Sequence, residues 1–242
     1  MKNKVVILAA GKGTRMKTDV PKVLVKVNDQ TMISMVVDAY SSPENEIAII
    51  VSPENIDAIK SELGNKCHEY IIQKDQLGTG HAVLCAENWL KDFDGNTLIT
   101  VGDAPFISRE IVKKLISVHE KSLAGCTFLT AKFVTPPPYG RVVRDNNGEI
   151  VKIVEEKDAN SSELMINEVS TSHYCFHNKL LLKYLNRIDN NNSQNEYYLP
   201  DVIKLMIEDN IKIDSFTVDD PYSLYGINSL EDLDFCKKRF NQ

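Results

Sequence analysis

Short apolar runs alternate along the first half of the chain with segments whose apolar residues recur at helical spacing. The runs predict β-strands near residues 4–10, 46–51, 69–73, 97–101 and 126–133. The segments between them predict helices over Met32–Ala39, Ile56–Leu63, Ala82–Leu90 and Ile111–Ile116. Because parallel strands need such crossovers, we expect an α/β fold with a mostly parallel, twisted sheet flanked by helices.

The pattern changes after Phe133, where three prolines precede two runs of alternating apolar and polar residues. These runs, Gly140–Arg144 and Glu149–Val154, flank a turn-forming segment and predict an antiparallel hairpin. We therefore expect a single domain, 1–242, in which residues 1–133 form the α/β part and residues 134–220 form a smaller antiparallel lobe. Residues 221–242 contain a last helix, Asn228–Phe240, that should pack back on the first part.

The composition limits the classes of protein that remain. With 242 residues, of which 43% are hydrophobic, the chain is long enough for one sizeable core. A net charge of −6 argues against a nucleic-acid partner, so any cluster of cations must act locally. The five cysteines are widely scattered, as expected of reduced thiols in a cytoplasmic protein. We expect no secretion signal and no membrane partner, because no segment has the required length and hydrophobicity.

One segment near the N-terminus carries most of the candidate chemistry. Gly11 and Gly13 follow the apolar strand Val5–Leu8 and let backbone N–H groups approach a bulky anion. Among the cations of this segment, Lys12, Arg15 and Lys22 are expected to surround that anion. Long cationic side chains suit a polyphosphate better than a single carboxylate. The segment therefore predicts a nucleoside triphosphate site.

The amino-acid sequence of this segment excludes two familiar phosphate-binding loops. A dinucleotide fingerprint requires a glycine where Met16 stands. A Walker A loop ends in Gly-Lys-Ser/Thr, whereas Thr14 directly follows Gly13. The remaining alternative is a glycine turn with ordinary surface cations. The string Thr14–Met16, followed by Pro21 and Lys22, argues against it.

The segment Val5–Lys22 resembles the opening signature of the sugar-nucleotidyltransferases, which join a nucleoside triphosphate to a sugar 1-phosphate and release pyrophosphate. In particular, it is similar to the uridylyltransferase domains of bifunctional bacterial enzymes that make UDP-N-acetylglucosamine. Further blocks in the same order support the likeness: Gln73, Gln76–Ala82, Gly102–Asp103, Tyr139–Arg141, Val154–Ala159, Asn191–Asn192 and Glu196–Asp201.

The resemblance implies a Rossmann-like nucleotidyltransferase fold. Its first part would bind UTP, and its smaller lobe would bind the sugar 1-phosphate. The favoured acceptor is N-acetylglucosamine 1-phosphate, and Mg²⁺ is the implied cofactor. The products would be a UDP-sugar and pyrophosphate.

Asp103 and Asn228 are the candidates for the Mg²⁺ site. Asp103 follows a predicted strand, so its carboxylate should face the crevice of the glycine loop, where polyphosphate demands an intervening cation. A helix cap or a turn explains Asp103 equally well from the residues alone. Asn228 stands three residues before Glu231 and approximates a capping box. The resemblance assigns both side chains to metal ligation instead.

The implied reaction needs no general base, because the attacking oxygen of a sugar phosphate is already anionic. By resemblance, Arg15 and Lys22 are the catalytic residues. Arg15 would hold the departing pyrophosphate, and Lys22 the α-phosphate or the incoming phosphate. The nucleotide-binding residues would be Leu8, Ala9, Ala10, Gly11, Gly13, Thr14, Gln73, Gln76, Gly78, Thr79 and Asp103.

Gln73 and the loop Gln76–Gly80 are expected to read the base. An amide side chain matches the imide edge of uracil, and Gly78 permits close backbone approach. An amide also accepts cytosine after a flip, so CTP remains an alternative. Thr79 is alternatively, or in addition, the N-cap of the following helix.

By resemblance, the sugar-binding residues are Gly140, Glu155, Ser170 and Tyr198. Glu155 and Glu156 are neighbours on a strand and point to opposite faces, so they cannot act as a paired acid and base. Glu155 would bind sugar hydroxyls and Glu156 would face solvent. Ser170 and Ser172 stand where the family usually has an asparagine and a glycine. This departure leaves open which sugar 1-phosphate is used.

His173, Cys175 and His177 alternate along the chain like a set of metal ligands. The outer two would lie roughly 13 Å apart on an extended strand, too far to share one zinc ion. We therefore expect core packing or a chance arrangement rather than a metal site.

No hexapeptide periodicity follows Asn228, so we expect neither the acetyltransferase domain of the bifunctional relatives nor the trimer that it forms. A monomer or homodimer is the expectation. The alternative to an enzyme is a non-catalytic module that binds a nucleotide sugar for regulation. Intact Arg15, Lys22, Asp103 and Asn228 argue against that alternative.

Overall fold

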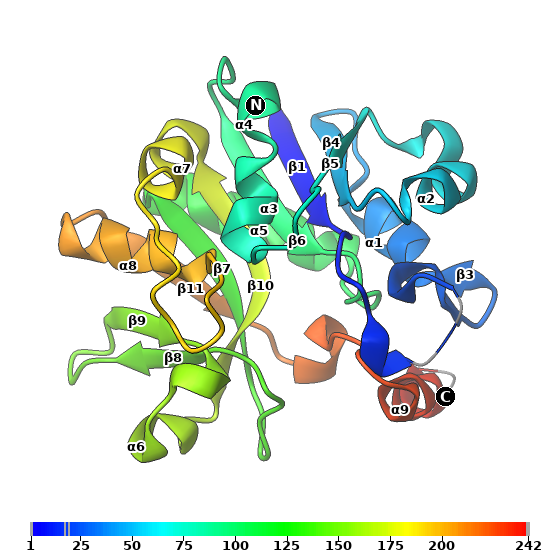
Figure 1. Cartoon of the computed structure of the whole chain (residues 1–242). Coiled ribbons are helices and arrows are strands. Elements are labelled where there is room, and N and C mark those ends of the chain that lie inside the picture. Colours follow the sequence, from blue (N-terminus) through cyan, green and yellow to red (C-terminus); the bar gives the residue numbers. More distant parts are fainter. Residues whose placement is uncertain (1, 17, 19, 241–242) are drawn as a thin grey trace.

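In the computed structural model, residues 2–16, 18 and 20–240 are described. Within this part of the chain, nine strands form one sheet (Figure 1). Their bounds are β1 (Asn3–Leu8), β4 (Asn45–Val51), β5 (Glu69–Ile72), β6 (Asn96–Val101), β7 (Cys126–Lys132), β8 (Arg141–Arg144), β9 (Ile150–Val154), β10 (Glu168–His177) and β11 (Ile213–Thr217). The main path runs β11-β7-β10-β6-β1-β4-β5, and β8 joins β10 to β9.

Helices cover both faces of this sheet. One face carries α1 (Met32–Tyr40), α2 (Ile56–Leu63) and α5 (Arg109–Ser122). The other face carries α3 (Thr79–Leu84), α4 (Glu87–Leu90), α7 (Asn178–Leu185) and α8 (Pro200–Glu208). The short α6 (Ser161–Leu164) lies near β8, and β2 (Lys26–Val27) pairs with β3 (Gln30–Thr31) outside the main sheet.

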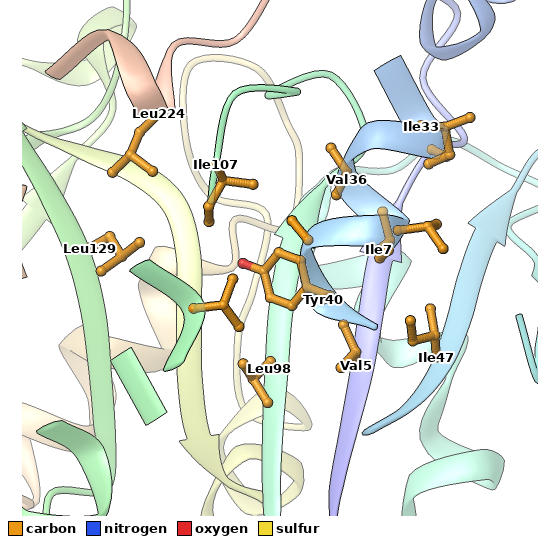
Figure 2. Packing of buried hydrophobic residues seen from close by; sticks show 14 of the residues in the cluster. Val5, Ile7, Ile33, Val36, Tyr40, Ile47, Leu98, Ile107, Leu129 and Leu224 are labelled. Atoms are coloured by element: carbon orange, nitrogen blue, oxygen red, sulfur yellow. The ribbon is translucent and has the colours of Figure 1, made fainter. Parts of the chain in front are cut away.

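The central strands are apolar at successive positions because both of their faces are buried. Val5 and Ile7 point towards α1, whereas Val6 lies in the core on the opposite face. Figure 2 shows the first of these cores, where the ring of Tyr40 lies among side chains from β1, β4 and β6. This packing holds β1 and β6 rigidly, and the candidate site lies just beyond their carboxyl ends.

The five predicted strands of the first part are confirmed to within two residues at each end. β1 is parallel to both β4 and β6, as the α/β prediction requires. It ends at Leu8 rather than at residue 10, because Ala9 already begins the glycine loop. The predicted helix Ala82–Leu90 is two shorter helices, α3 and α4. The predicted hairpin is confirmed as β8 and β9.

The segment 134–220, expected to form a smaller lobe, divides its strands between two places. β8 and β9 form the hairpin, whereas β10 and β11 lie in the main sheet. β10 is antiparallel to both β6 and β7 and lies between them. Its pairing with β7 is interrupted between Ser170 and Tyr174, and Ser172 there has a φ of +60°. β10 pairs with β7 on both sides of this bulge, whereas its other neighbour is β8 before the bulge and β6 after it.

The last helix, α9 (Leu230–Phe240), packs back on the N-terminal part as predicted. Cys236 and Ile227 form a small core with Met16 and Met32. The ring of Phe240 stacks on Phe106 with centroids 3.8 Å apart. Among the helices of the described residues, none combines the length and apolar character needed to cross a membrane.

Candidate active site

A cavity of about 610 Å³ opens beyond the carboxyl ends of the central strands. This is the position where α/β sheets bind ligands. The cavity is lined by many of the residues proposed from the sequence: Arg15, Thr79, Asp103, Gly140, Glu155, Ser170, Tyr198 and Asn228. Phosphate-binding and sugar-binding candidates from distant parts of the chain therefore meet at one place.

The glycine loop leaves the sheet between β1 and the turn η1 (Thr14–Met16). The N–H of Ala9 donates to Ile50 O at 2.8 Å, so this amide is already used within the protein. Leu8 O likewise accepts from Gly102 N at 2.9 Å. Ala10 is buried, and Gly11 is exposed. Gly13 has a φ of +60°, and a Cβ there would lie 2.5 Å from Lys22 Cβ.

Close packing at Gly13 brings the loop against the residue that begins the turn η2 (Lys22–Leu24). Only glycine combines this φ with this contact. Gly11 needs neither property, because a Cβ there would have no atom within 4 Å. The backbone of Thr14 begins η1, whereas its side chain lies outside the described part of the structure.

Lys22 lies between the two residues proposed as metal ligands. Its Nζ donates to Asp103 Oδ2 and, at 3.0 Å, to Asn228 Oδ1. The side chains of Lys22 and Asp103 are only 14% and 18% exposed. Arg15 Nη2 donates to the same Asn228 oxygen at 3.2 Å. Two cations, one carboxylate and one amide thus converge at one end of the cavity.

The alternative role of Asp103 as a helix cap is wrong. The N-cap of α5 is Ser108, whose hydroxyl accepts from Ile111 N at 3.3 Å. The Asp103 carboxylate instead faces Lys22, as the crevice interpretation requires.

Asn228 does not form the approximate capping box that its spacing to Glu231 indicated. The N–H groups of Asn228 and Ser229 both donate to Asp232 Oδ2 at 2.9 Å, and Ser229 Oγ accepts from Asp232 N at 3.1 Å. The cap is therefore one residue later and uses Asp232. This leaves the Asn228 carboxamide oxygen directed at the cations.

The donors at this end suit a hard divalent cation. Asp103 and Asn228 offer a carboxylate and an amide oxygen, and both converge on the positive charge of Lys22 Nζ. Mg²⁺ binds to proteins through one or two such oxygens together with substrate phosphates. Residues 2–16, 18 and 20–240 contain no group of three or more His, Cys, Asp and Glu side chains that could hold a metal ion alone. The residues therefore fit an ion that is shared with a phosphate ligand.

His173 and Cys175 of β10 are buried in the core, as expected, whereas His177 at the end of the strand is half-buried. His173 Nδ1 lies 2.7 Å from Thr100 Oγ1 and 3.2 Å from the Tyr40 hydroxyl. Burial lowers the pKa of His173 to about 3, so the ring is neutral. Cys175 is buried as a free thiol.

The residues proposed to read the base are engaged with the protein itself. Gln73 is buried, is not among the residues that line the cavity, and donates from Nε2 to Gly78 O at 3.1 Å. Gly78 has a φ of +112°, and a Cβ there would lie 2.5 Å from Tyr197 O. The close approach that Gly78 permits is therefore to the Tyr197 backbone. Gln76 is partly buried, in the same loop.

Thr79 is not the N-cap of α3; that position belongs to Gly78. The Thr79 hydroxyl accepts from Leu199 N at 3.0 Å, and Gly80 N donates to Tyr197 O at 2.7 Å. These two bonds join the loop Gln76–Gly80, which was expected to read the base, to the segment Tyr197–Leu199. The sequence carried no signal for this pairing.

Glu155 lines the cavity beside Gly140, a second residue proposed to bind the sugar. Burial raises the pKa of Glu155 to about 7, and the nearby carboxylates of Asp201, Asp158 and Glu196 add to the effect. At this pKa Glu155 exists in both protonation states near neutral pH. Its carboxylate form can accept a hydrogen bond from a hydroxyl group, and its protonated form can donate one to it.

The expectation that Glu155 and Glu156 are strand neighbours pointing to opposite faces is wrong. β9 ends at Val154, and the turn η4 (Glu156–Asp158) follows, so strand alternation no longer applies at these positions. Glu155 and Glu156 both line the cavity. Tyr198 closes this wall, where its hydroxyl accepts from Gln194 Nε2 at 2.7 Å.

The two serines of β10 form part of the cavity wall. Ser170 N donates to Gly140 O at 2.8 Å, and Ser170 Oγ lies 3.1 Å from the Tyr174 hydroxyl. Ser172 keeps a left-handed φ of +60°, which costs a non-glycine residue roughly 1 kcal/mol. Tyr174 and Tyr139 also line the cavity and were not predicted as site residues. The only sequence signals for a role in the site were the place of Tyr139 in the Tyr139–Arg141 block and the place of Tyr174 on β10.

The chain resembles known proteins in both sequence and structure. Residues 4–221 match the family described as nucleotidyl transferase. The bifunctional protein GlmU of Clostridium novyi (strain NT) is 44% identical over 224 residues, which cover 93% of this chain and 49% of that protein. GlmU of Streptococcus thermophilus (strain ATCC BAA-491 / LMD-9) is 42% identical over 246 residues, which cover 100% of this chain and 53% of that protein.

The chain thus spans about half the length of the curated relatives that it matches. Among solved structures, a UDP-glucose pyrophosphorylase complexed with UDP-glucose has a TM-score of 0.75 at 19% sequence identity. That match covers 100% of this chain and 99% of the other. It supports the predicted Rossmann-like nucleotidyltransferase fold.

Proposed function

The chain belongs to the nucleotidyl transferase family, and we propose that it is a Mg²⁺-dependent uridylyltransferase. It would join UTP to a sugar 1-phosphate and release a UDP-sugar and pyrophosphate. N-acetylglucosamine 1-phosphate is the favoured acceptor. The identity of 40–44% to GlmU proteins supports this choice of subfamily.

One observation carries the proposal. One cavity is lined by Arg15, by the proposed ligands Asp103 and Asn228, both of which Lys22 contacts, and by the sugar-binding candidates. A reaction between a nucleoside triphosphate and a sugar phosphate requires this arrangement, because the two phosphates must meet between the base and the sugar.

At the phosphate end, the protein would supply charge and position rather than a base. Arg15 would hold the departing pyrophosphate, and Lys22 would hold the α-phosphate or the attacking phosphate. Both side chains already meet at Asn228, so their charges act at one point. The attacking oxygen is anionic, and it needs only an in-line approach to phosphorus.

Asp103 and Asn228 would hold the Mg²⁺ ion through their side-chain oxygens. When bound, Mg²⁺ neutralises charge on the phosphate oxygens of the reacting group. Until the ion binds, Lys22 compensates the Asp103 carboxylate, because the two side chains form a mostly buried ion pair.

At the sugar end, Glu155 would bind hydroxyl groups of the acceptor. Gly140 would offer backbone contact, and Tyr198 would close the wall. Another sugar 1-phosphate is the second candidate acceptor, since Ser170 and Ser172 change the side chains that a sugar would meet. CTP and a purely regulatory nucleotide-sugar module remain outcomes of the test.

We further propose that the protein acts in the cytoplasm on small molecules, as a monomer or homodimer and without a nucleic-acid or membrane partner. The five free cysteines and the net charge of −6 support this proposal.

The test is a pyrophosphate-release panel that crosses the four nucleoside triphosphates with several sugar 1-phosphates, with and without Mg²⁺. We expect release with UTP and N-acetylglucosamine 1-phosphate, only when Mg²⁺ is present. Release with a different pair would reassign the substrate. Nucleotide binding without release from any pair would favour the regulatory module.

A further inference from the structure

Tyr139 connects the sugar end of the cavity to the metal end. It immediately precedes Gly140 in the chain, and its hydroxyl accepts a hydrogen bond of 2.7 Å from Gly226 N. Gly226 stands two residues before Asn228 in a different part of the chain. One phenol therefore spans two segments that are 87 residues apart.

Gly226 in turn sets the orientation of the Asn228 carboxamide. The Asn228 Nδ2 group donates to Gly226 O at 3.1 Å, which directs Oδ1 at Lys22 Nζ and Arg15 Nη2. Orientation matters because only the oxygen of an amide can ligate a cation. A carboxamide rotated by half a turn would present its NH₂ group instead.

The phenol is itself held firmly. The buried Arg141 donates from Nη1 to Pro137 O at 3.1 Å and to Tyr139 O, which anchors the backbone before the hairpin. The Tyr139 ring also packs against Tyr225, with centroids 6.2 Å apart. Burial raises the pKa of the Tyr139 phenol, so it stays neutral and protonated.

We propose that Tyr139 is a positioning residue for the metal ligand Asn228, acting through Gly226. The hydroxyl holds the N–H of Gly226, the carbonyl of the same residue holds the carboxamide, and the carboxamide oxygen is then available to the ion. This inference rests on the proposed Mg²⁺ site. Residues that orient metal ligands in this way typically change metal affinity or activity about 10- to 100-fold when they are replaced.

The test replaces Tyr139 with phenylalanine, which keeps the ring and removes only the hydroxyl. Mn²⁺ binding to the protein–UTP complex is measured by electron paramagnetic resonance and corrected for UTP alone. We expect Y139F to bind Mn²⁺ about 10-fold or more weakly than wild type. We also expect kcat at limiting Mg²⁺ to fall about as much, and to recover to within about threefold of wild type at saturating Mg²⁺.

Tyr222→Phe is the matched control. Like Tyr139, Tyr222 packs against Tyr225, with centroids 6.0 Å apart, and it makes an edge contact with Phe133 at 5.5 Å. Across the described residues, its hydroxyl has no recorded hydrogen bond. Mn²⁺ affinity and Mg²⁺ dependence of Y222F should stay within about twofold of wild type. Thermal unfolding of both variants verifies that each is folded.

A folded Y139F protein with the Mn²⁺ affinity and Mg²⁺ dependence of Y222F would overturn the role of Tyr139. A wild-type protein–UTP complex that binds no Mn²⁺ beyond that of UTP would overturn both the metal assignment and this inference. Absence of turnover in the wild-type protein, with Mn²⁺ binding intact and weakened in Y139F, would reject the proposed reaction alone.

Discussion

Replacing Gly13 with alanine should damage both folding and the placement of Lys22, without removing any charge. Gly13 has a φ of +60°, and an added Cβ would lie 2.5 Å from Lys22 Cβ and 3.5 Å from Lys22 Cα. Lys22 Cβ is bonded directly to the backbone, so it cannot rotate away from the added methyl group as the end of a side chain could. The backbone at Lys22 must therefore move.

The free-energy cost follows from three effects. The left-handed conformation costs alanine about 1 kcal/mol. Overpacking against Lys22 Cβ adds roughly 1–3 kcal/mol. Alanine also lowers the conformational entropy of the unfolded chain, which offsets about 0.4–1 kcal/mol of this loss of stability. We expect a net loss of about 2 kcal/mol, which lowers the urea midpoint by about 1 M at a typical m-value of ~2 kcal/mol/M.

Displacement of Lys22 should also reduce kcat/KM by about 10- to 100-fold, because a shift of ~1 Å in a positioning group has effects of this size. Gly11→Ala is the matched control for folding, since Gly11 has no positive φ and an added Cβ would have no atom within 4 Å. Its free energy of unfolding should stay within about 0.5 kcal/mol of wild type. The reasoning is refuted if both variants unfold at the same urea concentration.

Three further perturbations test other parts of the site. Asp103→Ala should fold and bind UTP but lose Mg²⁺-dependent pyrophosphate release; turnover equal to wild type across a Mg²⁺ titration would contradict the metal assignment. Ser170→Asn should raise the kcat/KM ratio of N-acetylglucosamine 1-phosphate to glucose 1-phosphate by about fivefold, the equivalent of one hydrogen bond of ~1 kcal/mol, and an unaltered ratio would count against a sugar contact. Burial raises the pKa of Glu155 from 4.5 to about 7, so between these values the folded protein keeps a proton that the unfolded chain has released. Wild-type stability should therefore fall as pH rises through this window, and Glu155→Gln should exceed wild type by up to about 3 kcal/mol at pH 8 but not at pH 4, as measured by urea unfolding; equal midpoints at pH 8 would contradict the buried carboxyl.

The strands of the first part could be predicted because their pattern is local. Val5, Val6 and Ile7 are all fully buried, since helices cover both faces of the sheet. Burial on both faces requires an apolar residue at every position, and such a run is visible in the sequence alone. The hairpin β8–β9 was predictable for a similar reason, because its turn residues and its alternation lie next to each other in the chain.

The base loop could not be predicted in the same way. Gln73, Gly78 and Thr79 carry the residue types expected of a nucleotide contact, yet their hydrogen bonds and close contacts are made within the protein. The bond between Leu199 N and Thr79 Oγ1 joins positions 120 residues apart. Local pattern carries no information about a partner at that distance along the chain.

Amino-acid types alone indicated cations and glycines for phosphate, whereas the resemblance to the sugar-nucleotidyltransferases assigned a carboxylate and an amide to a hard ion. Folding determined which of them meet, because Lys22 reaches Asp103 across 81 residues and Asn228 across 206 residues. In the folded chain Ser229 and Asp232 cap α9, so the Asn228 side-chain oxygen is not used in the cap and points into the site. Side-chain chemistry is a property of single residues, whereas distance and orientation arise only when the sheet and its helices have packed.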